Sequence, residues 1–163
     1  MSVKSHYVEF RNALSKNDSK KAEEEFEKAY NEAFLYYQNK LAENKKFDLS
    51  NEDERFALIT LTDNIIGYWA EGMLEDGIAL SESLIEFVES PKLKEMFKGY
   101  SIGMQSGLDV NEFMQKYMDL SKIDAEFPEF LCNFKENIKE LVKIKSKNGV
   151  DEFKDCILNR SGF

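Results

Sequence analysis

The sequence contains few of the residues that carry redox and metal chemistry. Its 163 residues include one histidine and two cysteines, Cys132 and Cys156, which are not in a CxxC spacing. We expect two buried free thiols in a reducing compartment, with a disulfide or a metal pair as the alternative. The single histidine, His6, cannot supply the Glu-x-x-His pairs of a di-metal carboxylate centre. We expect His6 to be an exposed surface residue.

Motifs for phosphate, dinucleotide and acyl chemistry are also absent. The chain has no GxxxxGK[ST] loop, no Rossmann fingerprint, no GxSxG elbow and no EF-hand loop. We therefore predict no catalytic residue, no metal and no cofactor, and the protein is expected not to be an enzyme. The alternative is an enzyme of unrecognised type, for which the glycine-rich segment 99–107 is the best evidence. That segment either packs closely or connects flexibly, with a ligand loop as the alternative.

Long apolar runs are missing as well. No stretch approaches the roughly 18 apolar residues that a membrane-spanning helix needs. Residues 1–15 have no apolar core and no small-residue cleavage site, so no secretory signal is expected there. These absences predict a cytoplasmic protein without a membrane partner.

Positive charge is scarce in one part of the chain only. Residues 1–50 carry nine acids and nine bases, and residues 91–163 carry twelve of each. Residues 51–90 carry ten acids and one base, which accounts for the entire net charge of −9. Because phosphate contacts need clustered Lys and Arg, this charge map argues against direct binding to nucleic acid. It favours a cationic partner instead.

The apolar residues that are present recur at helical spacing nearly throughout. No segment alternates as a strand would, and no repeat of fixed period indicates a solenoid. We predict an all-α fold, a single helical domain over residues 1–163 that forms a bundle of about six to eight helices of mixed length. The expected helices cover residues 3–15, 19–44, 50–61, 65–89, 91–98, 109–120, 127–149 and 150–159, with a break at residues 62–64.

The expected helix over residues 65–89 contains a stretch, Ala70 to Ser90, in which every charged residue is acidic. At about 100° per residue, five glutamates would fall within roughly 60° of arc, opposite a broad apolar face. These are Glu71, Glu75, Glu82, Glu86 and Glu89. Tyr68 and Ile78 would lie among them, and aromatic anchors surrounded by charge are typical of protein interfaces. The alternative is an acidic face that only keeps the protein in solution.

A small, acidic, helical, aromatic-rich chain without active-site motifs resembles the helical immunity proteins of bacterial polymorphic and contact-dependent growth inhibition toxin systems. The resemblance implies a cytoplasmic protein that binds a cognate, basic toxin domain, often a nuclease, and neutralises it. It implies acidic partner-binding residues with an aromatic anchor, for which we nominate Tyr68, Glu71, Glu75, Glu82, Glu86 and Glu89. The tyrosines Tyr30, Tyr36 and Tyr37 are held in reserve.

Two other functions stay open beside this resemblance. One is a helical adaptor or regulatory protein, which could form a homodimer through an apolar face. The other is an inhibitor that mimics nucleic acid, with carboxylates in place of phosphates.

Overall fold

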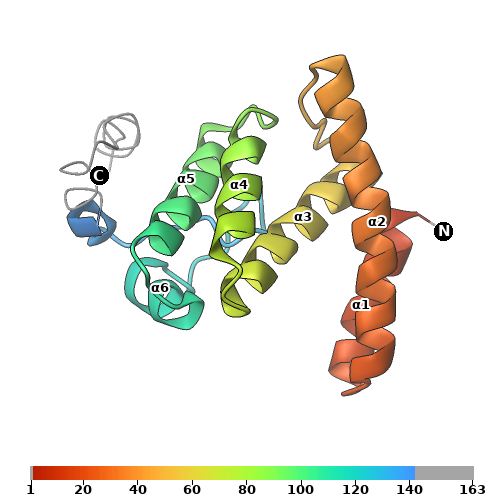
Figure 1. The fold of residues 1–163 in the computed structure, drawn as a ribbon, viewed down its shortest axis with the longest axis horizontal. Coiled ribbons are helices and arrows are strands. Elements are labelled where there is room, and N and C mark those ends of the chain that lie inside the picture. The colour runs from red at the N-terminus through yellow and green to blue at the C-terminus, as the bar shows by residue number, and fades with distance from the viewer. Residues whose placement is uncertain (1, 142–163) are drawn as a thin grey trace. The chain divides into compact units, whose positions relative to one another are not determined.

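The structure is a computed structural model that describes residues 2–141 (Figure 1). Within these residues it contains six helices and no strand, apart from one isolated bridge between Met118 and Phe134. Residues 138–141 begin a further helical stretch. The all-α prediction is therefore confirmed. The helices are α1 (Val3–Ser15), α2 (Ser19–Glu43), α3 (Glu52–Ala70), α4 (Leu74–Ile85), α5 (Pro91–Gln105) and α6 (Val110–Tyr117).

The expected helix over 150–159 and Cys156 lie outside the described residues, as does the end of the expected 127–149 helix. The chain divides into two compact units, residues 1–64 and residues 65 onward. Each unit is described by itself below.

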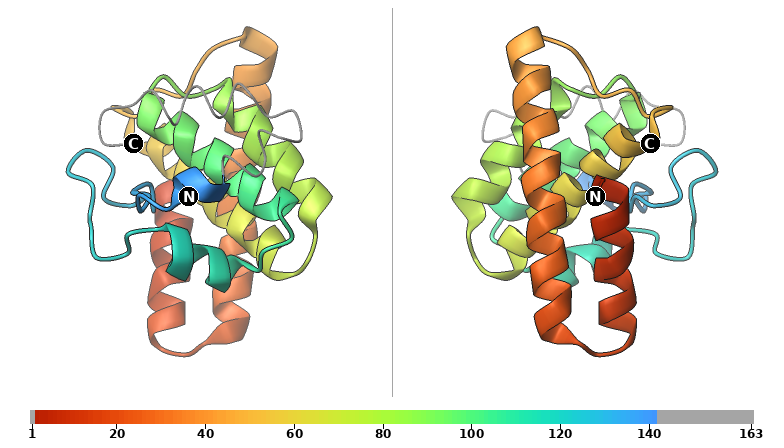
Figure 2. Two further views of the ribbon diagram at one scale, coloured as in Figure 1. Left: turned by 90° about the vertical axis from the view of Figure 1, so that its left-hand side faces the viewer. Right: turned by 90° about the vertical axis from the view of Figure 1, so that its right-hand side faces the viewer.

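The first unit is built on an antiparallel hairpin of α1 and α2 (Figures 1 and 2). Asp18 caps α2 by accepting a hydrogen bond from the backbone N–H of Lys21, and Asn44 ends it in the left-handed conformation at φ 53°. The seam of α2 is lined by small residues, since its buried positions are Ala22, Ala29 and Ala33. Short side chains let the two helices approach closely. The predicted bounds of both helices agree with the structure to within a residue.

The predicted break at residues 62–64 is wrong, because α3 runs through it to Ala70. The hydroxyl of Thr62 donates to the carbonyl of Leu58 one turn earlier, so this side chain stays inside the helix instead of capping a new one. The chain breaks instead at Gly72, whose φ is +79°. The N–H of Gly72 donates to the carbonyl of Trp69, and the N–H of Met73 donates to the carbonyl of Tyr68. This pair of hydrogen bonds is typical of a helix that ends at a glycine.

The second unit is built on α4 and α5, which run antiparallel beside one another (Figure 1). The hydroxyl of Ser81 on α4 donates to the carbonyl of Phe97 on α5 at 2.7 Å. α5 extends to Gln105, seven residues beyond its predicted end, and so contains Gly99 and Gly103. A Cβ on Gly103 would lie 2.6 Å from the ring of Trp69, so close packing is what this glycine provides.

The helix predicted from residue 127 is wrong over residues 127–137, which are irregular. Backbone groups that a helix would pair locally have distant partners here. The N–H of Lys135 donates to the carbonyl of Tyr117 at 2.7 Å, and that of Asp119 donates to Asn133 at 2.8 Å. We refer to residues 118–137 as the irregular segment. α6 is placed as predicted at its start, where Asp109 caps the N–H of Glu112.

Candidate partner-binding surface

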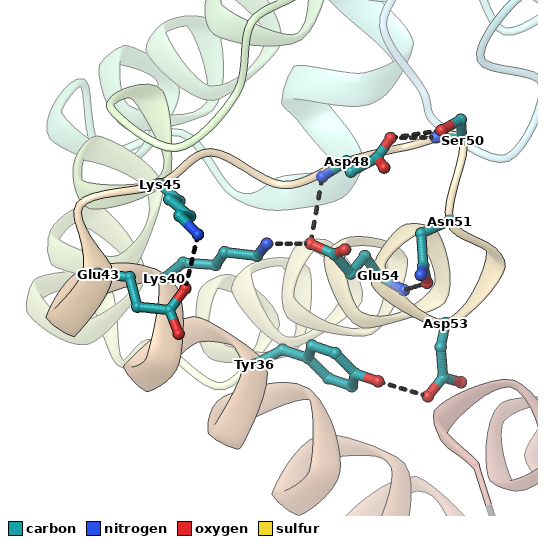
Figure 3. A network of polar contacts seen from close by, with 9 residues as sticks. All are labelled: Tyr36, Lys40, Glu43, Lys45, Asp48, Ser50, Asn51, Asp53 and Glu54. Carbon is teal, nitrogen blue, oxygen red and sulfur yellow. Dashed lines mark hydrogen bonds and ion pairs between the residues drawn. The ribbon is translucent and has the colours of Figure 1, made fainter.

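The ten acids of residues 51–90 fall into two groups, and the first group has partners inside the first unit. Glu54 forms an ion pair with Lys40 at 2.5 Å, and both side chains are largely buried (Figure 3). The hydroxyl of Tyr36 donates to Asp53 at 2.8 Å. Hydrogen bonding to this carboxylate raises the pKa of Tyr36. These contacts join the end of α2 to the start of α3, so their acids serve the fold.

The remaining acids of this group are also engaged. Glu52 forms an ion pair with Lys4. Asp63 accepts a hydrogen bond from the hydroxyl of Tyr7 at 2.6 Å. Burial raises the pKa of Asp63, and burial together with this carboxylate raises the pKa of Tyr7. All four acids of residues 51–64 therefore contact a partner within their own unit.

The second group, the acids of residues 71–89, lies in the second unit, and each of its side chains is exposed. Glu75 and Glu82 share one side of α4 with Ala79, and Glu86, the C-cap residue of α4, continues the row, because the spacing of 4, 7 and 11 residues from Glu75 places all four within about 60° of arc. We call this set the acidic face of α4: Glu75, Ala79, Glu82 and Glu86. Its carboxylates span about 16 Å along the helix. Across residues 2–141 no ion pair is formed by any of the five nominated glutamates.

The other two nominated glutamates do not lie on this helix. Glu71 follows α3 in the glycine turn, and Glu89 lies in the connection between α4 and α5. The prediction that all five carboxylates share one continuous helix is therefore wrong, because the turn at Gly72 separates α3 from α4. Their exposure leaves all five accessible to a partner.

Glu82 differs from its neighbours because α5 holds its side chain. Its Oε1 atom accepts hydrogen bonds from the hydroxyl of Ser101 at 2.9 Å and from the amide of Gln105 at 3.2 Å. Gln105 also donates to Ser101 at 2.9 Å. Sequence reasoning missed this arrangement, since nothing in the spacing of α5 indicates that these two residues face α4. Replacing Glu82 would therefore disturb the α4–α5 pair as well as the surface charge.

Tyr68, nominated as the aromatic anchor, lies near the end of α3 and is half-buried. A Cβ atom added to the buried Gly77 would lie 3.5 Å from the Cβ atom of Tyr68. Gly77 follows Glu75 by two residues, or about 200° around α4, so the base of Tyr68 lies on the side away from the acidic face. Ile78 is half-buried beside that face. The role of Tyr68 as a partner contact stays a prediction.

The reserve tyrosines and His6 lie in the first unit. Tyr30 stacks on Phe34 with ring centroids 5.9 Å apart, and Phe34 contacts Tyr37 at 5.7 Å. The expectation that His6 is exposed is wrong, because its ring is largely buried and its Nδ1 atom lies 2.8 Å from Glu25. This hydrogen bond is the main reason why the pKa of Glu25 is lowered.

The described part of the chain offers no group of three or more His, Cys, Asp or Glu side chains that could hold a metal ion. Cys132 is a free, buried thiol, and its burial raises its pKa to about 11. None of the helices within residues 2–141 is both long enough and apolar enough to span a membrane.

Comparison of the chain with models of protein families, with curated proteins and with solved structures gives no match.

Proposed function

We propose that this chain is a cytoplasmic, immunity-type protein that binds a cationic toxin domain through the acidic face of α4 and neutralises it. The observation that carries the proposal is the exposed row of Glu75 and Glu82 on α4 and Glu86 at its C-cap, with no Lys or Arg on this helix. The acids of the first unit have internal partners, whereas these carboxylates keep their charge available to a partner.

Such a surface acts by attraction followed by docking. Complementary fields raise association rates toward about 10⁸ to 10⁹ M⁻¹s⁻¹ at low salt, which suits an inhibitor that must reach a toxin quickly. A nuclease exposes Lys and Arg where it holds phosphates, and a row of carboxylates about 16 Å long can occupy that position. Ala79, in the middle of the row, lets the partner approach the helix closely.

The test uses the basic domain encoded by the gene directly upstream of this chain, purified and mixed with it in a stopped-flow instrument. The variant is Glu75→Lys/Glu86→Lys, because neither side chain forms a hydrogen bond or ion pair within residues 2–141. Glu82 is kept, so its bonds to Ser101 and Gln105 remain. We expect association at low salt to slow by about tenfold or more, and the salt dependence of the rate to weaken.

The matched control is Glu23→Lys/Glu27→Lys on the exposed side of α2, which changes the net charge by the same amount. We expect the control to keep most of the wild-type rate. Equal slowing by both variants would show that only net charge matters and would contradict a defined surface. Absence of any complex with the upstream product would contradict the proposed function itself.

A further inference from the structure

One side of α2 keeps large apolar residues exposed. Leu35 has 53% of its surface exposed and Leu41 has 57%, and both lie within the helix. At about 100° per residue, these two leucines share one side of α2 with four neighbours, within about 120° of arc. Among these neighbours Phe34 is half-buried and the others are exposed. We call this set the outer face of α2: Asn31, Phe34, Leu35, Gln38, Leu41 and Ala42.

The packed side of α2 lies opposite the outer face. Ala29 and Ala33, two buried residues of its seam, lie about 160° away from Asn31 around the helix, one on each side. Lys40, which pairs with Glu54 at the start of α3, lies about 180° away. A further helix laid along the outer face would therefore leave these inner contacts of α2 in place.

The charges at the two ends of the outer face have opposite sign. Glu23 and Glu24, the acidic pair, precede it; both are exposed, and neither forms a hydrogen bond or an ion pair within residues 2–141. Lys45 and Lys46, the basic pair, follow the end of α2 and are exposed. Lys45 forms an exposed ion pair with Glu43 at 3.6 Å, and a surface pair of this kind contributes little.

The bases beside the acidic pair are partly engaged elsewhere. Lys28 forms an ion pair with Glu25 at 3.5 Å, and Lys21 forms one with Glu9 at 3.6 Å. Glu27 adds a third exposed carboxylate on the same side of the helix. This end of the outer face therefore carries net negative charge.

The two charged pairs lie equally far from the middle of the outer face. The acidic pair lies eleven residues before the midpoint between Phe34 and Leu35, and the basic pair lies eleven residues after it. A second α2 laid antiparallel across this midpoint would place each acidic pair beside a basic pair. Phe34 of each copy would meet Leu35 of the other, and the side-chain amides of Asn31 and Gln38 would meet on either side. A parallel arrangement would instead bring like charges together.

The mixed signs also distinguish a second copy from other occupants. Nucleic acid or an anionic membrane would be attracted by the basic pair but repelled by the acidic pair. A uniformly cationic protein would be repelled by the basic pair. A second copy of the chain matches both pairs at once.

We propose that the outer face of α2 is the contact surface of a two-fold, antiparallel homodimer of this chain. A two-fold interface uses the same patch on both copies, so it requires a patch that is complementary to itself. The contact is one helix wide, so it belongs to the small, transient class of interfaces and forms at high protein concentration. It uses no residue of the acidic face of α4 and does not depend on the proposed function.

The test measures the mass of the full chain by sedimentation equilibrium over about three decades of concentration, into the submillimolar range. We expect the average mass to rise from 19.0 kDa toward twice that value. Glu23→Lys/Glu24→Lys and Lys45→Glu/Lys46→Glu should each weaken self-association by about tenfold or more, because attractive pairs at both ends become repulsive. Circular dichroism checks that each variant keeps its helices.

Mixing the two charge-reversed variants gives the sharpest result. In an equimolar mixture, each reversed pair meets its opposite on the other variant, so association should recover to about the wild-type strength. Both variants keep a net negative charge, so attraction between whole molecules cannot explain the recovery. Leu35→Ser should weaken association by about fivefold, because it removes apolar contact at the centre.

The controls change the second unit in the same way. Glu75→Lys/Glu86→Lys matches the charge change, and Leu120→Ser removes a leucine that is 51% exposed. Each control should leave self-association within about twofold of the wild type.

A mass of 19.0 kDa at every concentration would overturn the proposal. A dimer that persists in both charge-reversed variants, or a mixture that associates no better than its components, would also overturn it. None of these results affects the proposed function. The stopped-flow comparison uses submicromolar protein, at which a transient dimer of this size is dissociated.

Discussion

α4 and the irregular segment both pack on α5 and both reach the surface, yet different interactions shape them. α4 is a regular helix whose backbone groups pair with one another, and its packing follows from its apolar face. The irregular segment relies on distant partners: Phe134 meets Gly99, Leu131 accepts from Tyr100, and Asp124 pairs with Lys92. A periodic pattern is sufficient for the first region, whereas the second region depends on α5 being in place.

Removing the ring that joins the irregular segment to α5 should have the largest effect on this difference. Phe134→Ala deletes a ring whose Cζ atom would lie only 2.2 Å from a Cβ on Gly99. We expect the free energy of unfolding to fall by about 2–4 kcal/mol, with hydrogen exchange of residues 119–137 accelerated more than that of α4. Denaturant titration and exchange mass spectrometry measure the two quantities.

Leu120→Ala is the control for this variant, since the side chain lies in the same segment but is half exposed. It should change stability by less than about 1 kcal/mol. Equal acceleration of hydrogen exchange in α4 and in residues 119–137 after Phe134→Ala would contradict this difference, because both regions would then unfold together.

A smaller effect should come from filling the space that this ring uses. Gly99→Ala improves helix propensity by about 1 kcal/mol but displaces Phe134, so we expect a net loss of about 1–2 kcal/mol. Gly67→Ala on α3 is the matched control, because nothing lies within 4 Å of its Cβ and its backbone is helical. That variant should gain up to about 1 kcal/mol.

Combining the two changes gives a direct check. In a Phe134→Ala background, Gly99→Ala should no longer destabilise, since the ring that it displaces is gone. Additive losses in the double variant would mean that some other contact opposes a side chain at position 99.

The smallest effect should come from the ion pair that braces the irregular segment. The hydrogen bond from Lys92 is the main reason why the pKa of Asp124 lies below its ordinary value. A carboxyl whose folded pKa is lowered contributes stability above its unfolded pKa, about 4, and this contribution is lost as pH falls through the folded value. Lys92→Met should therefore reduce stability at pH 7 by no more than about 1 kcal/mol and flatten the loss of stability below about pH 4.

Denaturant titrations between neutral and acid pH measure this contribution, with Lys94→Met on the same helix as the control. The control should follow the wild-type pH dependence. A wild-type profile in Lys92→Met would show that the two backbone N–H groups at Asp124 are sufficient to hold this part of the irregular segment.

Much of the fold could be predicted where local signals and packing agree. The bounds of α1 and α2 follow from apolar spacing and from the cap at Asp18, and the start of α6 follows from the cap at Asp109. The signal for the true end of α3 was also present, as a glycine followed by a hydrophobic residue, Gly72-Met73. The polar residues at 62–64 were a stronger local signal and gave the wrong break, because Thr62 and Asp63 use their side chains elsewhere.

The candidate surface could be predicted in part. The exposure of the five glutamates follows from their charge alone. Their charge does not indicate that Glu71 lies in the turn before α4 and Glu89 in the connection after it. The hydrogen bonds that fix the Glu82 side chain to α5 come from two residues about twenty positions away in the sequence. The irregular segment was missed because apolar residues at helical spacing, such as those after Phe127, look the same whether they line a helix or anchor a loop.

Residue types and their spacing are sufficient to predict an all-α fold, the start and end of the first hairpin, and a net negative charge confined to residues 51–90. These properties depend on residue type and on spacings of three or four positions, which are visible along the chain. Tertiary contacts are needed to explain which acids have partners inside the protein and why residues 127–137 are not helical. Each of these depends on a partner far away in the sequence, such as Tyr7 for Asp63 or Tyr117 for Lys135. Local propensity cannot indicate such a partner, because its contribution appears only when the chain has folded.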